Sequence, residues 1–180
     1  MDFKPTHIEG LIIINPNVYD DKRGYFFESY NQSTFKINGL KLNFVQDNES
    51  FSQKGVLRGL HFQAPPYEQG KLVRVIQGSV LDVAVDIRPN SPTYGQHKSI
   101  ILSGKNKTQF WIPPGFAHGF LTLEKNTIFC YKCTGPYNKS SEGALLWSDP
   151  QLNINWNIKQ PIVSSKDQEA ELFEHFKSPF

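Results

Sequence analysis

The sequence predicts an all-β domain with a short helix near its C-terminus. Three pairs of segments alternate apolar and polar residues around a short turn, which is typical of β-hairpins. The pairs are residues 71–77 and 80–88 around Gly78 and Ser79, residues 97–103 and 107–113 around residues 104–106, and residues 118–124 and 127–133 around Lys125 and Asn126. Consecutive hairpins with short turns favour an antiparallel sandwich or barrel over a parallel sheet.

The rest of the chain adds edge strands and little helix. Residues 10–19, 24–30 and 43–50 have the composition of strands, and residues 31–39 can form a turn or two of helix. The best helix candidate is residues 164–176, where Ser165 and Gln168 have the spacing of a capping box. Its apolar positions are Leu172, Phe173 and Phe176, which can share one helix face. No linker or repeat divides the chain, so we expect one domain over residues 1–180.

The composition is that of an ordinary globular protein. Hydrophobic residues make up 38%, charged residues 20%, and the net charge is +2, which is too small for a nucleic-acid-binding surface. Residues 1–16 contain no basic region followed by a long apolar stretch. We therefore expect no signal peptide and no membrane span, a cytoplasmic location, and neither a membrane nor a nucleic acid as partner.

Two cysteines, Cys130 and Cys133, form a C-x-x-C sequence within a predicted strand. Residues three apart on a strand face opposite sides, so a disulfide between them is not expected. No second pair is present to complete a zinc site. The pattern favours free thiols.

Basic side chains in an otherwise apolar strand region are the first sign of a functional site. Arg58, His61 and Lys71 lie within the stretch Gly55–Val75. Arg58 and His61 would face opposite sides of a regular strand, so a bulge at Gly59 is needed to direct both inward. A cavity that holds Arg, Lys and neutral His can bind an anion and move a proton. The alternative is that His61 is a structural histidine of the core.

Two further side chains are candidates for proton transfer. Tyr131 shares a strand face with Phe129 and Cys133, and its phenol either ends a hydrogen-bond network in the core or donates a proton. Asp167 falls in the first turn of the predicted C-terminal helix, where the helix dipole favours a carboxylate. It is either an ordinary first-turn acid or the partner that fixes the tautomer of a buried histidine.

The segment FWIPPGFAHGF, residues 110–120, resembles the second sequence motif of cupins, in which the histidine, here His118, binds a metal. The first cupin motif has two histidines, of which this chain keeps His61 and replaces the other with Gln63. A nitrogen ligand is hard to replace. The resemblance therefore implies a cupin barrel without a metal, whose pocket serves acid–base chemistry.

Polar and aromatic side chains elsewhere complete the set of candidates. They are Arg23, Phe26, Glu28, Gln46, Asn48 and Tyr137. The first three lie in residues 21–30 and form either a charged strand edge or a ligand contact. The two amides can hydrogen-bond a base or a sugar, and the tyrosine can stack on a flat ring.

Taken together and in order, these segments resemble the dTDP-4-dehydrorhamnose 3,5-epimerase family. The matching pieces are DKRGYFFESY, VQDNESFSQKGVLRGLHFQAPPYEQGKLVRVIQGSVLDVAVDIRPNSPTYG, FWIPPGFAHGF, YKCTGPY and WSDPQLNINW, and SSKD fits the family's tail. They cover most of residues 10–156, and the ordered set is specific although single pieces are not. The resemblance implies an enzyme with a cupin jelly roll, no metal or other cofactor, and a homodimer whose N-terminal strands are exchanged between the two subunits.

The resemblance also implies a role for each candidate. His61 would be the base, with Asp167 as its partner. Tyr131 would be the acid on the opposite face of the sugar, and Lys71 would stabilise the enolate. The substrate-binding residues would be Arg23, Phe26, Glu28, Gln46, Asp47, Asn48, Arg58, His118, Tyr137, Glu142 and Lys166, with Arg23 and Glu28 supplied by the other subunit.

The implied reaction is the epimerisation of dTDP-4-keto-6-deoxy-D-glucose at carbons 3 and 5 to dTDP-4-keto-L-rhamnose. The ketone at carbon 4 acidifies both hydrogens, each enolate needs a cation beside its oxygen, and inversion needs an acid opposite the base. Arginines can bind the diphosphate. Three alternatives stay open: a single-site epimerase of a related dTDP-4-keto sugar, a metal-dependent cupin oxygenase and a non-catalytic sugar-binding cupin.

Overall fold

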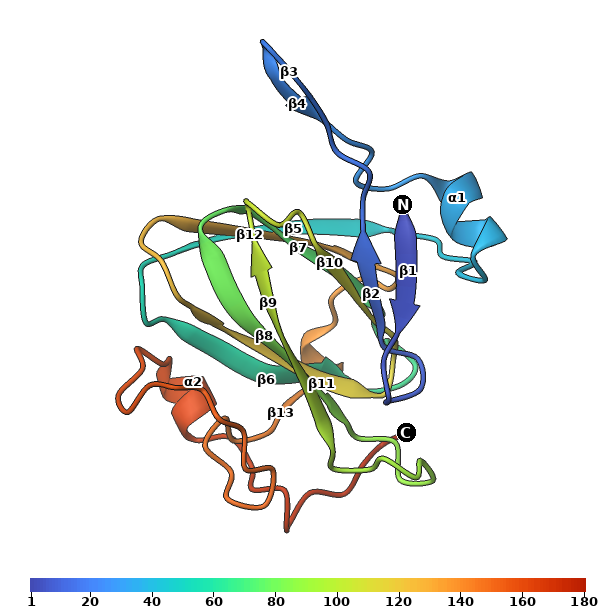
Figure 1. Ribbon diagram of the computed structural model, residues 1–180. Helices are drawn as coiled ribbons and strands as arrows, with labels where there is room; N and C mark the ends of the chain where they lie inside the picture. Colours follow the sequence, from blue (N-terminus) through green and yellow to red (C-terminus); the bar gives the residue numbers. More distant parts are fainter.

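The computed structural model describes residues 1–180 and has two antiparallel sheets packed face to face as a jelly-roll sandwich (Figure 1). The six-stranded sheet has the order β1 (Asp2–Pro5), β2 (Ile12–Asn15), β10 (Gln109–Ile112), β7 (Lys71–Gln77), β12 (Thr127–Cys133) and β5 (Gln46–Ser52). The five-stranded sheet has the order β13 (Glu142–Ala144), β6 (Leu57–Gln63), β11 (Phe116–Thr122), β8 (Ser79–Asp86) and β9 (His97–Ser103). This architecture confirms the predicted fold class.

The three predicted hairpins are wrong as pairings, because each short turn carries the chain from one sheet to the other. Strands β7, β10 and β12 belong to the six-stranded sheet, whereas β8, β9 and β11 belong to the five-stranded sheet. In a sandwich, the inner faces of both sheets supply apolar side chains to the same interior. Alternation of apolar residues is therefore the same for a hairpin and for a turn that crosses between sheets.

The interior between the sheets is apolar in one part and opens to a pocket beside it. Val73, Phe110 and Phe129 of the six-stranded sheet meet Ala84 and Phe120 of the five-stranded sheet there, and all five are buried. Burying such side chains contributes about 1.5–3 kcal/mol each for the larger ones. This packed part fixes the spacing of the two sheets, and therefore the width of the pocket beside it.

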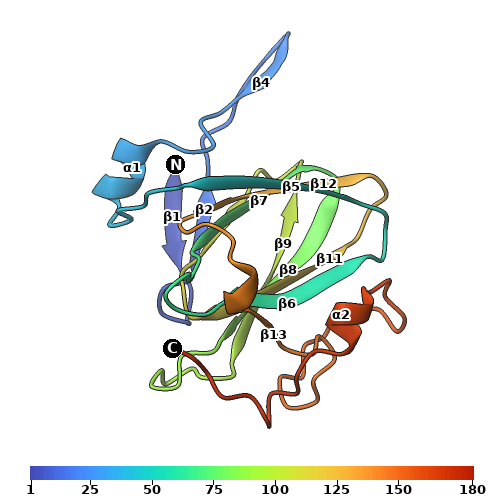
Figure 2. The same ribbon diagram turned by 180° about the vertical axis from the view of Figure 1, so that it is seen from behind.

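Segments outside the sheets cover their outer faces. The C-terminal segment lies along the outer side of the five-stranded sheet (Figure 2). Its Trp156 and Phe173 are buried there against residues of that sheet. Helix α1 (Gln32–Ile37), which the sequence predicted, inserts Phe35 between Leu72 and Trp111 on the outer side of the six-stranded sheet.

The C-terminal helix is much shorter than predicted. Helix α2 spans only Ser165–Gln168, and its N-cap is Ser164, whose side chain accepts a hydrogen bond from the Asp167 N–H, so the predicted capping box does not form. Beyond Gln168 the chain leaves the helix and is anchored by individual contacts instead. The Phe173 N–H donates to the Asp149 carboxylate at 2.8 Å, and its ring is buried in the outer cluster. Tertiary packing thus overrides the helical pattern of residues 169–176.

A two-stranded hairpin, β3 (Tyr19–Asp21) and β4 (Gly24–Phe26), projects from the body of the sandwich (Figure 1). Its aromatic residues Tyr19 and Phe26 are 63% and 66% exposed. We call residues 19–26 the arm. No helix in the structure is both long and apolar enough to span a bilayer.

Candidate active site

A pocket of about 570 Å³ lies between the two sheets, next to the apolar interior. Its polar and charged lining residues are Ser50, Arg58, His61, Lys71, His118, Tyr131, Glu142, Ser164, Lys166 and Asp167. The chain thus brings together, from both sheets and from α2, all four residues predicted to be catalytic.

The predicted bulge at Gly59 is confirmed and explains how β6 directs two side chains into one pocket. Arg58 and His61 pair with Phe120 and His118 of β11, so two residues of β6 lie opposite one of β11. Gly59 has a φ of +136°, and a Cβ there would lie 2.5 Å from the Cα of Gly119. Only glycine fits this close approach.

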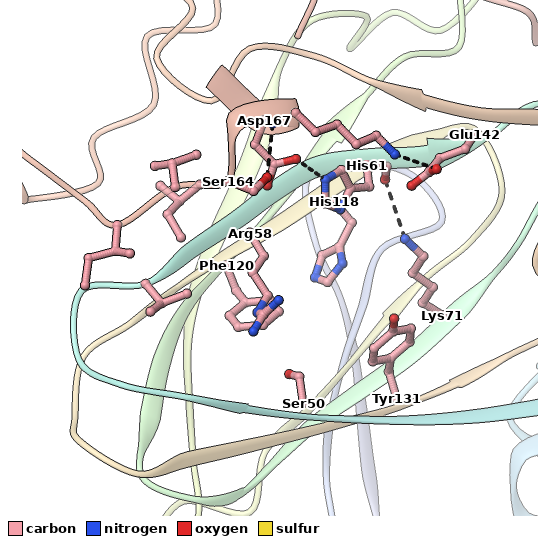
Figure 3. Close-up of a pocket in the computed structure, with 15 residues that line it drawn as sticks. Ser50, Arg58, His61, Lys71, His118, Phe120, Tyr131, Glu142, Ser164 and Asp167 are labelled. Carbon is pink, nitrogen blue, oxygen red and sulfur yellow. Dashed lines mark hydrogen bonds and ion pairs between the residues drawn. The ribbon is translucent and has the colours of Figure 1, made fainter. Parts of the chain in front are cut away.

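His61 and Asp167 form a hydrogen-bonded pair at the pocket wall (Figure 3). His61 Nε2 lies 2.6 Å from Asp167 Oδ1, and the Gly59 N–H donates to Oδ2 at 3.3 Å. Burial favours the neutral carboxyl group, but these hydrogen bonds outweigh it and hold the pKa of Asp167 below its usual value. Since the carboxylate accepts from Nε2, the remaining ring nitrogen, Nδ1, is the basic atom of His61.

Tyr131 faces His61 from the opposite wall, because β12 belongs to the six-stranded sheet (Figure 3). Burial raises the pKa of the phenol. The hydroxyl group therefore keeps its proton at neutral pH and is suited to donate it.

Lys71 extends from β7 between these two walls (Figure 3). Its Nζ donates to the carbonyl oxygen of His61 at 3.5 Å. Enclosure in the pocket lowers the pKa of the ammonium group, and the carboxylates of Asp82 and Glu142 oppose that change. The amino group of Lys71 thus lies between the two candidate proton-transfer groups.

A second histidine–carboxylate pair lies deeper in the pocket. Of its two members, His118 was predicted from the sequence and Asp82 was not. His118 Nε2 lies 2.9 Å from Oδ2 of Asp82, which is fully buried on β8. Asp82 was not singled out in the sequence, although it interrupts the apolar run VLDVAV, residues 80–85. A carboxylate on the inward face of a buried strand was the available signal.

At the mouth of the pocket, Glu142 joins two segments. Its carboxylate accepts from Lys166 at 2.5 Å and from the Tyr137 hydroxyl at 3.0 Å. Burial favours the neutral acid, but these two donors and nearby His61 hold the pKa of Glu142 below its usual value. The charged rim links α2 to the loop after β12.

Polar groups on β5 continue from this rim. The Tyr137 N–H donates to Gln46 Oε1 at 2.9 Å, and Gln46 Nε2 donates to Asn48 Oδ1 at 3.1 Å. Asp47 between them points to the other face of the sheet, where it pairs with Lys132 at 2.8 Å. Gln46, Asn48 and Tyr137 thus lie together, and Asp47 is turned away from them.

Comparisons with known proteins agree with this geometry. A family described as dTDP-4-dehydrorhamnose 3,5-epimerase matches residues 5–175 of the chain. The chain belongs to the dTDP-4-dehydrorhamnose 3,5-epimerase family. A member from Salmonella typhimurium is 54% identical over 171 residues, which are 94% of this chain and 93% of the relative.

Solved structures place the chain among epimerases of this kind. An epimerase from Legionella pneumophila in complex with dTDP-4-keto-L-rhamnose is 50% identical, with a TM-score of 0.94 over 98% of this chain and 94% of that one. A 3'-monoepimerase from Streptomyces bikiniensis in complex with dTDP-quinovose is 29% identical, with a TM-score of 0.89 over 94% of this chain and 87% of that one. The fold is thus shared by enzymes described as double and as single epimerases.

Three residues predicted to bind substrate in this epimerase family member lie away from its own pocket. Arg23 and Phe26 are on the arm, where the Arg23 guanidinium pairs with Asp21. Glu28 follows the arm and accepts from Asn31 Nδ2 at 2.9 Å. One subunit therefore does not bring these residues to its own catalytic groups.

The cysteines and possible metal ligands can be placed as well. Cys133 is buried, Cys130 is half-buried, and neither forms a disulfide, as the opposite faces of β12 required. His61 and His118 each have Nε2 bonded to a carboxylate. No group of three His, Cys, Asp or Glu side chains in the chain is arranged to hold a metal ion.

Proposed function

We propose that this protein epimerises dTDP-4-keto-6-deoxy-D-glucose at carbons 3 and 5, which yields dTDP-4-keto-L-rhamnose. One observation carries the proposal: His61 and Tyr131 face each other across a single pocket, with Lys71 between them. Identity of 54% with an epimerase of this name over nearly the full chain supports the choice of reaction.

In the proposed mechanism, His61 acts as the base. Its Nδ1 takes the proton from carbon 3, the C–H electron pair forms a double bond to carbon 4, and the carbonyl pair moves onto oxygen. Asp167 stabilises the imidazolium ion that results. The Lys71 ammonium group stabilises the enolate oxygen, because a fixed cation in an enclosed site is worth more than one in water.

Tyr131 completes each inversion as the acid. Its hydroxyl proton passes to the same carbon on the face opposite His61, while the double-bond pair forms the new C–H bond and the carbonyl is restored. Solvent returns a proton to the phenolate and accepts one from His61. The same steps at carbon 5 give the product, since the ketone at carbon 4 acidifies both neighbours.

The nucleotide half of the substrate would bind along the mouth of the pocket. Arg58 and Lys166 offer positive charge to the diphosphate. Glu142 and His118 would contact the substrate from either side. Gln46, Asn48 and Tyr137 would form the end that receives the nucleoside, with the tyrosine stacked on thymine. Asp47 points to the other face of the sheet, where it pairs with Lys132, so it does not contribute to this end.

We further propose a homodimer in which the arm of each subunit reaches the partner's pocket. The exposed aromatic residues of the arm support this, because an extended hairpin of this composition is typical of a protein contact. Arg23, Phe26 and Glu28 of the partner would then complete the binding site. Two free thiols are consistent with a reducing, cytoplasmic compartment.

The test is to incubate the protein with dTDP-4-keto-6-deoxy-D-glucose in heavy water and to follow the product by proton NMR. Deuterium at carbons 3 and 5 together with the L-rhamno product supports the proposal. Deuterium and inversion at one carbon would indicate the second candidate, a single-site epimerase, which the similarity to a 3'-monoepimerase favours. No exchange at either carbon would contradict both.

A further inference from the structure

Asp82 is a buried carboxylate inside the sandwich that the proposed mechanism leaves without a role. It lies on β8 between Val80 and Ala84, which face the apolar interior, and its exposed fraction is 0%. An ionised carboxylate in such a place is costly unless a hydrogen-bond donor compensates it. Asp82 therefore needs a specific partner.

That partner is His118 on the neighbouring strand β11. Its Nε2 lies 2.9 Å and 3.1 Å from the two oxygens of Asp82, which form no other hydrogen bond. Because a carboxylate only accepts, Nε2 carries the hydrogen, and Nδ1 of the neutral ring keeps its lone pair. The ring lines the pocket, and its Nδ1 has no hydrogen-bond partner in the chain (Figure 3).

The surroundings of His118 keep its ring neutral and leave its orientation to Asp82. Burial lowers the pKa of His118, the charges of Lys71 on β7 and His61 on β6 act in the same direction, and Asp82 opposes them. The Phe129 ring, with its centroid 6.2 Å away, stacks on the imidazole without choosing between its nitrogens. The carboxylate is thus the group that decides which nitrogen faces the pocket.

We propose that Asp82 is a positioning residue of the epimerisation, which holds His118 in the Nε2–H tautomer with Nδ1 open to the pocket as an acceptor for a sugar hydroxyl. This inference rests on the proposed function, because the hydroxyl belongs to the hexose of the dTDP-4-keto sugar. His118 on β11 lies directly opposite His61 on β6. A sugar hydroxyl bound by His118 therefore places a neighbouring ring carbon near His61. Asp82 acts through His118 and does not itself contact the substrate.

The Asp82→Asn variant tests this role, since it keeps the size of the side chain but can donate to the imidazole. We expect kcat/KM for the dTDP-4-keto sugar to fall by about 10- to 100-fold, by analogy with the loss of a carboxylate that orients a metal-bound histidine. In nitrogen-15 NMR of the free protein, the His118 signal should leave the Nε2–H pattern of the wild type. A purely structural role would not change the tautomer.

Asp86→Asn is the matched control. Asp86 lies on the same strand, is also 0% exposed, and bonds Arg88, Ser91 and Thr93 away from the pocket. This variant should lower Tm and leave both kcat/KM and the His118 tautomer as in the wild type. An activity loss in Asp82→Asn no larger than in this control, at a similar drop in Tm, would overturn the inference.

Two other results would also overturn it: an unchanged tautomer in Asp82→Asn, or wild-type kcat/KM in that variant. If Asp82→Asn does not fold, the double variant Asp82→Leu, His118→Phe removes the pair together, a change that proteins often tolerate. It should lose as much activity as His118→Phe alone, and wild-type turnover in it would contradict the inference. Each of these failures leaves wild-type epimerisation intact, whereas failure of the proposed function means that the wild type itself does not turn over the sugar.

Discussion

Asp167 Oδ1 lies 2.6 Å from His61 Nε2, although the two residues are 106 positions apart in the chain. One is on β6 inside the sandwich, and the other is on α2, a four-residue helix in the C-terminal segment. The base of the proposed reaction is thus completed by a segment outside the two sheets. Cutting or loosening that segment would change the chemistry of His61 without touching the jelly roll.

Replacing His61 with alanine should lower kcat by about 10³-fold, because a positioned general base contributes about 10²- to 10⁴-fold. Binding of dTDP should stay close to wild type, since the imidazole faces the sugar and not the nucleotide. Turnover of the 4-keto sugar by NMR and dTDP binding by calorimetry measure the two effects. His175→Ala is the control, because that side chain is 69% exposed on the surface. Full turnover in His61→Ala would instead favour a sugar-binding protein.

The fold class could be predicted from the sequence because alternation of apolar and polar residues shows that a segment is a strand with one buried face. It does not record which strand lies beside it. The turns at Gly78 and Asn126 are as short as those of hairpins, yet each crosses to the other sheet. Pairing in a jelly roll depends on contacts between strands distant in the chain, which local pattern does not contain.

The site was predictable where polar residues break an apolar strand, and not where the contact spans the chain. Arg58, His61 and Lys71 stand out in their own segment, and the glycine bulge follows from their spacing. The pairing of Asp167 with His61 in particular was predicted only from the resemblance to a family, because the sequence of α2 does not show that this helix packs against β6. Asp82 was overlooked although it breaks an apolar alternation in the same way as His61 does.

Replacing Asp167 with asparagine should lower kcat by at least about 10²-fold, because an amide does not stabilise the imidazolium and can hold the wrong tautomer. Turnover of the 4-keto sugar by NMR measures this loss.

The stability of the folded protein at low pH should also depend on the ionisation of Asp167. Folding lowers the pKa of Asp167 from an unfolded value of about 3.9, so its contribution is fully present above that pH and is lost as pH falls through the folded pKa. As pH falls below about 3.9, the Tm of the wild type should therefore fall more steeply than that of the variant. Equal slopes would show that the His61 contact does not stabilise the carboxylate.

Replacing Tyr131 with phenylalanine should separate proton removal from inversion. His61 can still form the enolate, so exchange of carbon-bound hydrogen with heavy water should continue at a substantial fraction of the wild-type rate. Net inversion should fall by about 10²-fold or more, because the opposite face lacks its acid. Proton NMR follows both quantities in one sample. Equal losses of exchange and inversion would mean that Tyr131 acts before the enolate forms.

Replacing Gly59 with alanine should disrupt the bulge that directs Arg58 and His61 into one pocket. The new Cβ would lie 2.5 Å from the Cα of Gly119, and the residue would have to keep a φ of +136°. Strained backbone of this kind costs about 1–3 kcal/mol before the clash is counted. We expect the free energy of unfolding, measured by urea denaturation, to fall by at least about 2 kcal/mol.

The matched control for this variant is Gly39→Ala. Gly39 also has a positive φ, +87°, but a Cβ there meets nothing within 4 Å. The control therefore carries the conformational strain without the contact with β11, and it lies outside the sheets. Gly59→Ala should lose more stability than Gly39→Ala, and only Gly59→Ala should lose turnover, because it alone changes where His61 points. Similar losses of stability with full turnover in both would show that β6 can present its two side chains without the bulge.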